Sequence, residues 1–311
     1  TPRLFIVALV INKKLFEKKN RTVLENIFGV MSINSKRNAG YKYSIHDIFA
    51  EAILMLSDRQ RFERTGFKIL DFIKILLNRV DVNKQIDNEV GDYTTSLKLA
   101  SEKGYLDLVK ILLEHGADVN STTGDYDYTA LMYASKYEHI KIVQILLKHG
   151  ADVNIQNRNG FTALIYASER GYSKIVGMLL EHGADINQLS NFGENALMIA
   201  INQKYVSLDD ITKTVKILLD YKVNVNIKNK KDGSTALMSA LKLDYSKIVE
   251  MLLEHGADVN EKDNNGTTAL MLSVNDVMIW RETVKMLLEH GADVNEKDNN
   301  GYTAFMLSVN D

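Results

Sequence analysis

The sequence of 311 residues contains no cysteine, one proline and one tryptophan. The absence of cysteine excludes a disulfide framework, a thiolate metal site and a cysteine nucleophile. One proline among 18 glycines excludes a collagen-like chain. The apolar run Leu4–Ile11 is eight residues long, far short of the roughly 18–20 residues that cross a bilayer. We interpret this run as a buried element and expect no membrane span.

The chain also lacks a strong excess of charge of either sign. Its formal net charge is -2 and its pI is about 6.4. A content of 45% hydrophobic and 25% charged residues is typical of globular proteins and excludes disorder of the whole chain. Residues 1–90 carry 16 Lys+Arg and 10 Asp+Glu, a net charge of +6, and the remaining residues carry -8. We interpret the basic part as a solvated face and do not expect nucleic acid as a partner, although residues 1–90 are where it would bind.

The sequence is dominated by an internal repeat. A segment Gly-Ala-Asp-Val-Asn, with Ile for Val in one copy, recurs with spacings of 34, 33, 73 and 35 residues, and residues 220–226 form a degenerate copy inside the longest gap. A second segment of the type Thr-Ala-Leu-Met keeps the same phase. Two landmarks with one period exclude coincidence. The first segment lies at 116–120, 150–154, 183–187, 256–260 and 291–295, and the second begins at Thr95, Thr129, Thr162, Asn195, Thr235, Thr268 and Thr303.

Each copy predicts two short helices and a loop. Thr162 can cap the first helix, a turn follows at 169–172, and the apolar spacing of residues 175–180 is that of a second helix. Gly183 then stands where the chain leaves this helix in a left-handed conformation. Asn159-Gly160 predicts a tight turn before the next copy. One copy alone cannot bury its helix pair, so neighbouring copies must stack.

This pattern resembles the ankyrin repeat family, clearly over residues 91–311 and weakly over part of 44–90. The resemblance implies an all-α solenoid of stacked helix-turn-helix units with hairpin-like loops. Two positions depart from the family pattern. The family's proline at the start of the first helix is replaced by Ser96 or by alanine, and its histidine two residues later is replaced by Lys98, Met132, Ile165, Met198, Met238, Met271 and Met306.

We divide the chain into three parts. Residues 1–43 are a helical N-terminal cap or a degenerate repeat, residues 44–90 are a degenerate ankyrin repeat, and residues 91–311 hold about six full repeats and a partial one. Insertions lengthen the repeats at 191–230 and 264–298, and the second lies near Trp280, which is either a core or a contact residue.

Two local features in these repeats lead to specific expectations. In the first insertion Ser207 is expected to cap a longer helix, and Lys222 takes the place of the exit glycine. At the other end, Phe305 and Leu307 have no second helix after them, so we expect further chain, a partner or a second copy to cover this edge.

No catalytic or cofactor-binding constellation is present. The sequence has no His-Glu-x-x-His, phosphate loop, Gly-x-Ser-x-Gly or dinucleotide fingerprint. Five of the seven histidines recur once per repeat before the exit glycine, which suits the helix dipole and spreads them too widely for one metal ion. We therefore expect no enzyme activity, cofactor, metal or small-molecule substrate.

The resemblance places partner binding on the hairpin tips and on the ends of the first helices. Aromatic side chains occupy several successive tips, where a solvated loop has no packing need for them. The alternative is that each ring folds onto its own repeat. The candidate partner-binding residues are Tyr126, Tyr128, Tyr137, Arg158, Phe161, Glu169, Arg170, Phe192, Asn202 and Gln203.

These features predict a non-catalytic interaction module or scaffold that binds a protein through the concave face. Two alternatives remain open at this point: a regulatory or targeting segment of a longer enzyme or effector, and an inhibitory, immunity-type partner of another protein. Self-association through the open C-terminal edge is a further expectation. We expect a soluble protein, cytoplasmic or secreted as an effector.

Overall fold

The computed structural model describes residues 49, 53, 69–87, 93–122, 124, 126–274 and 280–308. The chain forms two compact units. Unit 1 comprises Thr1–Ala130 with Lys148–Gly150, and unit 2 comprises Leu131–Leu147 with Ala151–Asp311. The expected cap at 1–43, the run Leu4–Ile11 and the side chain of Trp280 lie outside the described residues.

Unit 1 contains three described helices and a small hairpin. Helix α6 (Ile69–Leu77) precedes the two-residue antiparallel strands β1 (Ile86–Asp87) and β2 (Tyr93–Thr94), which pair Ile86 with Thr94. The helix pair α7 (Ser96–Glu102) and α8 (Leu106–Glu114) follows directly. Helix α6 lies within the segment 44–90 that the sequence assigns to a degenerate repeat.

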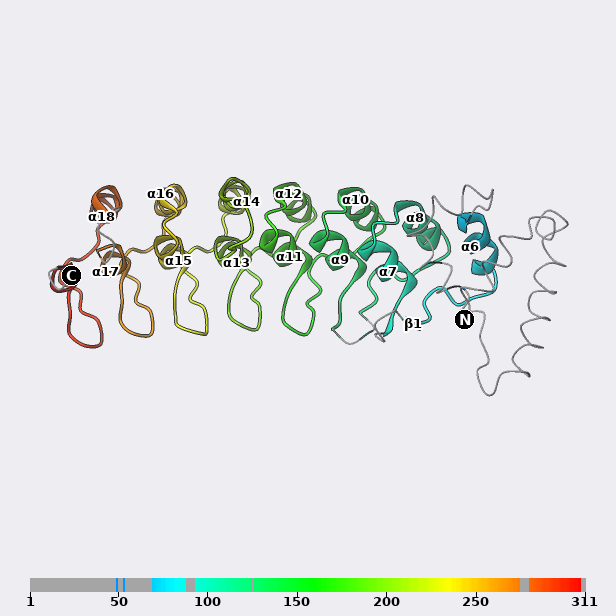
Figure 1. Cartoon of the computed structure of the whole chain (residues 1–311), viewed down its shortest axis with the longest axis horizontal. Coiled ribbons are helices and arrows are strands. Elements are labelled where there is room, and N and C mark those ends of the chain that lie inside the picture. Colours follow the sequence, from blue (N-terminus) through cyan, green and yellow to red (C-terminus); the bar gives the residue numbers. More distant parts are fainter. Residues whose placement is uncertain are drawn as a thin grey trace. The chain divides into compact units, whose positions relative to one another are not determined.

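Unit 2 repeats one helix pair along its length. In Figure 1 the first helices form one row, the second helices form another, and the hairpins project from the side of the first helices that faces away from the second. This arrangement is the stacked helix-turn-helix fold expected from the sequence. The first helices are α9 (Ala130–Lys136), α11 (Ala163–Glu169), α13 (Ala196–Ile201), α15 (Ala236–Lys242), α17 (Ala269–Ser273) and α19 (Ala304–Ser308), and the second are α10 (Ile140–Lys148), α12 (Ser173–Glu181), α14 (Leu208–Asp220), α16 (Ser246–Glu254) and α18 (Trp280–Glu289).

The first helices begin where the sequence predicts. Thr162 caps α11 by accepting the backbone N–H of Ile165 at 3.2 Å, and Asn195 caps α13 by accepting that of Met198 at 3.1 Å. These contacts satisfy N–H groups that have no partner inside the helix. Every residue of α13 is buried, because first helices lie between neighbouring repeats and their own second helices.

The second helices bury one apolar stripe each. In α12 the stripe is Ile175, Val176, Leu179 and Leu180, with Lys174 exposed on the other side. Gly183 then leaves the helix with φ +83°, as the sequence predicts. The stripe is the main source of stability, because burial of each such side chain contributes about 1.5–3 kcal/mol.

The first insertion forms the longer helix that the sequence predicts. Helix α14 has 13 residues, against nine in α12. Ser207 caps it by accepting the backbone N–H of Asp210 at 3.1 Å. Lys222 follows the helix with φ +60°, in place of the exit glycine.

Across the part of the chain that the structure describes, no helix has the length and apolar character needed to cross a membrane.

Candidate functional site

The hairpins of unit 2 are joined to one another by backbone hydrogen bonds. The N–H of Asn191 donates to the carbonyl of Asn159 at 3.0 Å, and that of Lys230 donates to Phe192 at 2.9 Å. Equivalent bonds of 2.8 and 2.9 Å join Asn264 to Asp232 and Asn299 to Asn265. The tips therefore form a row whose backbone is ordered before any partner arrives.

A ladder of asparagine side chains supports the base of this row. The amide of Asn154 donates to the carbonyl of Gly183 at 3.2 Å and accepts the N–H of Asp185 at 2.7 Å, both in the next repeat. Asn226 and Asn260 repeat both bonds further along, and in unit 1 Asn83 bonds Gly116 and Asp118 in the same way. These recurrent asparagine residues therefore join successive repeats.

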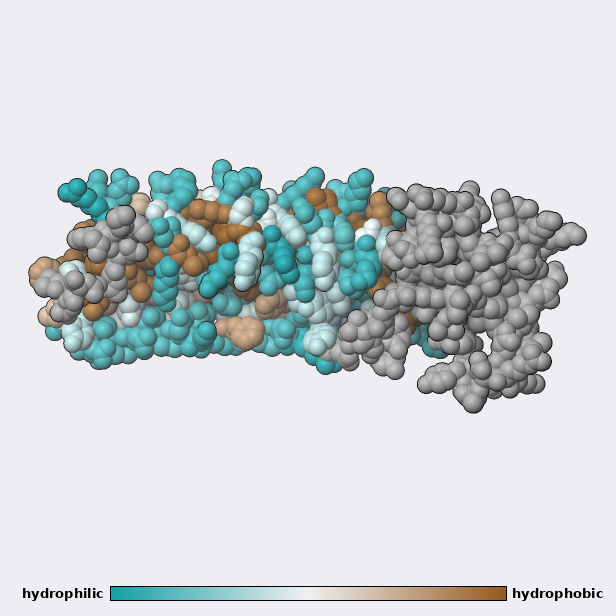
Figure 2. All heavy atoms as spheres, viewed as in Figure 1, coloured by the Kyte–Doolittle hydropathy of each residue, from teal (hydrophilic) through white to brown (hydrophobic). Residues whose placement is uncertain are grey.

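Phe192 is the most prominent aromatic side chain of the row. It is 57% exposed, and Leu189 on the same hairpin is also exposed. Figure 2 shows a largely hydrophilic surface along the hairpins of unit 2, interrupted by a hydrophobic spot over the hairpin that precedes α13. The backbone on both sides of this ring is held by the bonds of Asn191 and Lys230. An exposed apolar ring on an ordered loop loses little conformational entropy on binding.

Phe161 is half-buried and lies against its own repeat. Its ring is tilted against Tyr166 with the centroids 5.3 Å apart. The hydroxyl of Tyr166 accepts the side-chain amide of Asn157 at 2.8 Å. The Nζ atom of Lys136 lies 5.2 Å above the Tyr166 ring and 5.9 Å from that of Tyr137. Phe161, Tyr166, Lys136 and Tyr137 form one cation–aromatic cluster, in which Lys136 and Tyr166 lie on α9 and α11 and the other two lie next to these helices.

In unit 1 the hairpin tip carries two tyrosines. Tyr126 and Tyr128 pack edge to face with their ring centroids 6.4 Å apart. Tyr126 is 59% exposed and Tyr128 is half-buried. Asp127 between them has φ +55°.

The remaining candidate residues lie at helix ends and on one hairpin. Glu169 and Arg170 are neighbours whose charged atoms lie 3.9 Å apart. Asn202 is exposed at the end of α13, whereas the amide of Gln203 donates to the carbonyl of Ile199 at 2.9 Å. Arg158 is exposed, and its carbonyl accepts the side chain of Asn191. The side-chain amide of Gln203 therefore bonds the end of α13 and is less available to a partner.

The structure adds residues that the candidate set lacked. Lys136 and Tyr166 join Phe161 and Tyr137 into one cluster, and Leu189 enlarges the apolar area at Phe192. Sequence spacing points only weakly to Tyr166 and Lys136 as binding residues, because both stand on first helices, three or more residues from the hairpin tips. Only the stacking of repeats brings them to one place.

The recurring histidines cap the second helices. The Nδ1 atoms of His115, His182, His255 and His290 lie 2.7 to 2.8 Å from the carbonyl oxygen four residues earlier, so Nδ1 carries the proton and donates. Among the residues the structure describes, no three His, Asp or Glu side chains are grouped closely enough to hold a metal ion.

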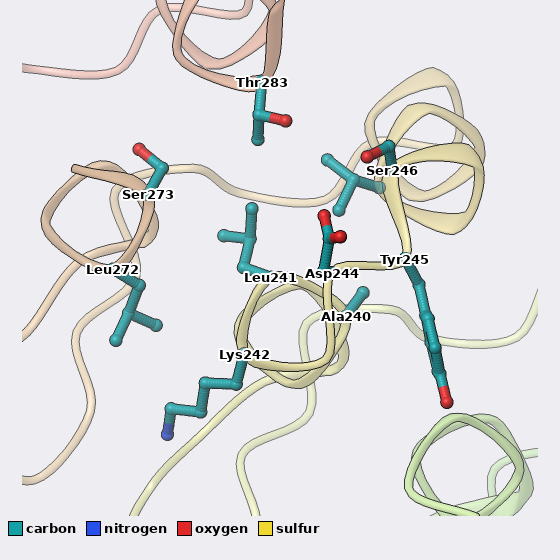
Figure 3. Close-up of a pocket in the computed structure, with 10 residues that line it drawn as sticks. Ala240, Leu241, Lys242, Asp244, Tyr245, Ser246, Leu272, Ser273 and Thr283 are labelled. Carbon is teal, nitrogen blue, oxygen red and sulfur yellow. The ribbon is translucent and has the colours of Figure 1, made fainter. Parts of the chain in front are cut away.

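A cavity of about 70 Å³ lies between the turn that joins α15 and α16 and the helices α17 and α18 (Figure 3). Asp244, Ser246, Ser273 and Thr283 line it together with apolar neighbours. Small-molecule sites usually occupy about 300–1,000 Å³, so this cavity does not suit a substrate or cofactor.

A larger apolar groove of about 490 Å³ borders α19. Phe305, which lines it, is 75% exposed, whereas its counterpart Leu270 one repeat earlier is 3% exposed. The groove also includes Val284, Leu288 and Val294.

Stacked pairs of short helices with projecting, mutually bonded hairpins define an α-helical repeat protein. Family models for ankyrin repeats match residues 65–157, 125–190, 153–211, 184–263 and 265–299. The chain therefore belongs to the ankyrin repeat family, whose fold is a general protein–protein interaction fold and is typically non-catalytic.

Curated relatives resemble short parts of the chain. Ankyrin repeat protein 14 of vaccinia virus (strain Western Reserve) is 38% identical over 66 residues, 21% of this chain and 27% of that protein. The putative ankyrin repeat protein L271 of Acanthamoeba polyphaga mimivirus is 43% identical over 65 residues, 21% of this chain and 9% of that protein. The match thus spans about a quarter or less of the length of these relatives.

Two solved structures resemble a larger part of this chain. The ankyrin repeat domain of human ASB11 has a TM-score of 0.56 and 26% identity, covering 69% of this chain and 92% of that one. The ankyrin repeat domain of Bcl-3, a member of the IkappaB family, has a TM-score of 0.57 and 25% identity over 69% of this chain and 93% of that one.

Proposed function

We propose that this protein is a non-catalytic module or scaffold that binds a protein partner through the hairpin tips and first-helix ends of its repeats. The observation that carries the proposal is Phe192, a ring 57% exposed on a hairpin whose backbone is bonded to both neighbours. Exposed aromatic side chains on ordered supports are frequent hot spots of protein interfaces. We also propose that the protein is soluble, as expected from its sequence.

The cation–aromatic cluster supports the same surface. Tyr137 is 44% exposed and Lys136 lies over two rings, so a partner side chain can pack on Tyr137 without reordering the cluster. Phe161 contributes an edge of its ring and not the whole face, because Tyr166 covers part of it. We therefore rank Phe192 and Tyr137 above Phe161 as contacts.

The test compares exposed aromatic residues on and off this surface. A partner is captured from the lysate of the producing cells, purified, and titrated against Phe192→Ala and Tyr137→Ala. Tyr205→Ala and Tyr221→Ala are matched controls, because both rings are exposed in unit 2 but lie on the insertion before α14 and at the end of α14. We expect at least about a tenfold rise in Kd for Phe192→Ala, which corresponds to about 1.4 kcal/mol. Equal effects of test and control substitutions would contradict the proposed surface.

Self-association is a second candidate, favoured by the exposed Phe305 in the apolar groove at α19. Sedimentation at rising protein concentration tests it. A dimer that Phe305→Ser abolishes supports the candidate, and a monomer at all concentrations removes it.

A further inference from the structure

Three Asn-Gly pairs lie on the hairpins of unit 2. In such a pair the backbone nitrogen of the glycine can attack the amide carbon of the asparagine side chain, because glycine has no Cβ that hinders the approach. All three asparagines are exposed, so each pair is a candidate for deamidation. The pairs are Asn159-Gly160, Asn265-Gly266 and Asn300-Gly301, and the sequence contains no other.

The three turns are alike within themselves. Each glycine N–H donates to the carbonyl three residues earlier, at 2.8, 2.9 and 3.0 Å in chain order. Each asparagine N–H donates to the side-chain oxygen two residues earlier, at 3.0, 2.9 and 2.9 Å. Residues 261–266 and 296–301 are also identical in sequence. The turns themselves therefore give no reason for different reactivity.

The following hairpin covers the first two pairs. The carbonyl of Asn159 accepts the N–H of Asn191 at 3.0 Å, and that of Asn265 accepts the N–H of Asn299 at 2.9 Å. The glycines of both pairs are buried. A Cβ at Gly266 would lie 2.9 Å from the backbone nitrogen of Asn299. These two turns are thus held by a neighbour as well as by their own bonds.

The third pair is open. Gly301 is exposed, and a Cβ there would meet no atom within 4 Å. The hairpin of Asn300 is the last of the row that the structure describes (Figure 1). Ring closure requires the asparagine backbone to rotate out of the turn. A turn that is bonded to a neighbour must first open locally, and this opening lowers the rate.

We propose that Asn300 is a deamidation site, whereas Asn159 and Asn265 are protected by the hairpin that follows each of them. The nitrogen of Gly301 forms a bond to the amide carbon of Asn300. The side-chain nitrogen leaves as ammonia and takes the proton of the peptide nitrogen, and a cyclic imide remains. Water then opens this ring at either carbonyl and gives aspartate or isoaspartate.

The product changes the end of the hairpin row. Both forms add a carboxylate that is ionised at neutral pH, and isoaspartate also adds a methylene to the backbone. Tyr302 follows directly, and Thr303 accepts the N–H of Met306 at 3.3 Å at the start of α19, which borders the apolar groove. The reaction itself goes beyond the proposed function, and only its effect on a partner depends on it.

The experiment follows the three asparagines in one sample of the full chain. The folded protein is incubated in mildly alkaline buffer below its melting temperature and then digested. Mass spectrometry measures the conversion of amide to carboxylate in each peptide, and an isoaspartyl-specific methyltransferase counts the isoaspartate. We expect Asn300 to react at least about tenfold faster than Asn265, because the turn of Asn265 must lose its bond to Asn299 first.

Three controls separate the contact from the local sequence. In urea Asn265 and Asn300 should react at nearly equal rates, because the residues before them and the glycine after them are identical. Asn191→Pro removes the N–H that bonds Asn159, so it should speed the reaction of Asn159 several-fold and leave that of Asn300 unchanged. Asn300→Gln should remove the reaction at this hairpin, since glutamine would have to close a larger ring.

The wild-type comparison alone can overturn the proposal. Equal rates at Asn265 and Asn300 in the folded chain would do so, as would an Asn300 that does not react. A difference that persists in urea would assign the effect to Tyr302, which stands where the other copy has Thr267. A folded Asn191→Pro protein with an unchanged rate at Asn159 would remove the protection by the next hairpin. Because no partner is used, failure here is distinct from failure of the proposed binding surface.

Discussion

Left-handed residues mark where individual repeats depart from their common plan. In the described parts of the chain, Asp127, Glu138, Lys222 and Asp244 have positive φ without being glycine. Each replaces a glycine of the repeat: Glu138 and Asp244 stand at the interhelix turn held by Gly171, and Lys222 at the helix exit held by Gly183. The strain at Lys222 could be predicted from the sequence, because its neighbours in register are all glycine. The burial of Lys98 in α7 could not, because it depends on how α7 packs.

Restoring glycine at the helix exit should stabilise unit 2. A left-handed side chain costs about 1–2 kcal/mol, and the greater freedom of glycine in the unfolded chain offsets about half of this. We expect Lys222→Gly to raise the free energy of unfolding by about 0.5–1 kcal/mol, measured by urea titration. The reciprocal control is Gly183→Lys, whose Cβ meets no atom within 4 Å and which should be destabilising by a similar amount. A destabilised Lys222→Gly protein would show that Lys222 makes a compensating contact.

Buried hydroxyl groups without a partner offer a second test. Ser135 and Ser168 stand at the same position of neighbouring first helices, and their hydroxyls have no hydrogen-bond partner. We expect Ser168→Ala to raise stability by about 1 kcal/mol, because an unsatisfied buried polar group is costly. The control is Ser190→Ala, since the buried Ser190 hydroxyl accepts the N–H groups of Phe192 and Glu194 at 3.3 Å each. Thermal melts should move in opposite directions for the two variants, and a loss of stability in Ser168→Ala would contradict the account.

At the scale of elements, the helices could be predicted closely, and the hydrogen bonds between neighbouring repeats only partly. Threonine caps, apolar stripes and exit glycines are local signals, so the helix pairs follow from the sequence. The longer helix α14 was predicted by the same logic from its cap Ser207. The particular backbone hydrogen bonds between hairpins follow less directly from the sequence, because they join groups 32 to 38 residues apart whose partners depend on how the repeats stack.

The asparagine ladder allows the contribution of the bonds between repeats to be measured. Asn154 forms two bonds to the next repeat, at 3.2 and 2.7 Å, and each such bond contributes about 0.5–1.5 kcal/mol. We expect Asn154→Ala to lower the free energy of unfolding by about 1–2 kcal/mol. Asn300→Ala is the matched control, because the Asn300 side chain bonds Asp298 of its own hairpin. Equal losses in the two variants would show that the ladder does not hold repeats together.

At the scale of the whole molecule, family membership defines a kind of function and not a partner. The framework repeats from copy to copy, whereas the exposed side chains at tips and helix ends differ: Tyr126, Phe161 and Phe192 at three tips, and Tyr137, Arg170 and Asn202 at three helix ends. Sequence reasoning found this variable set, but not how much of each ring is covered. The exposure of the rings separates these residues: the Phe192 ring is exposed, whereas the Phe161 ring is partly covered by Tyr166.

The most direct test of the proposed surface is site-specific photo-crosslinking to the captured partner. A benzoylphenylalanine is placed at position 192, on the hairpin row, or at position 205, on the insertion, where the native tyrosine is fully exposed. The account predicts a covalent adduct with the partner from position 192 and none from position 205. An adduct from position 205 alone, or no adduct from position 192 under conditions where the partner is bound, would contradict it.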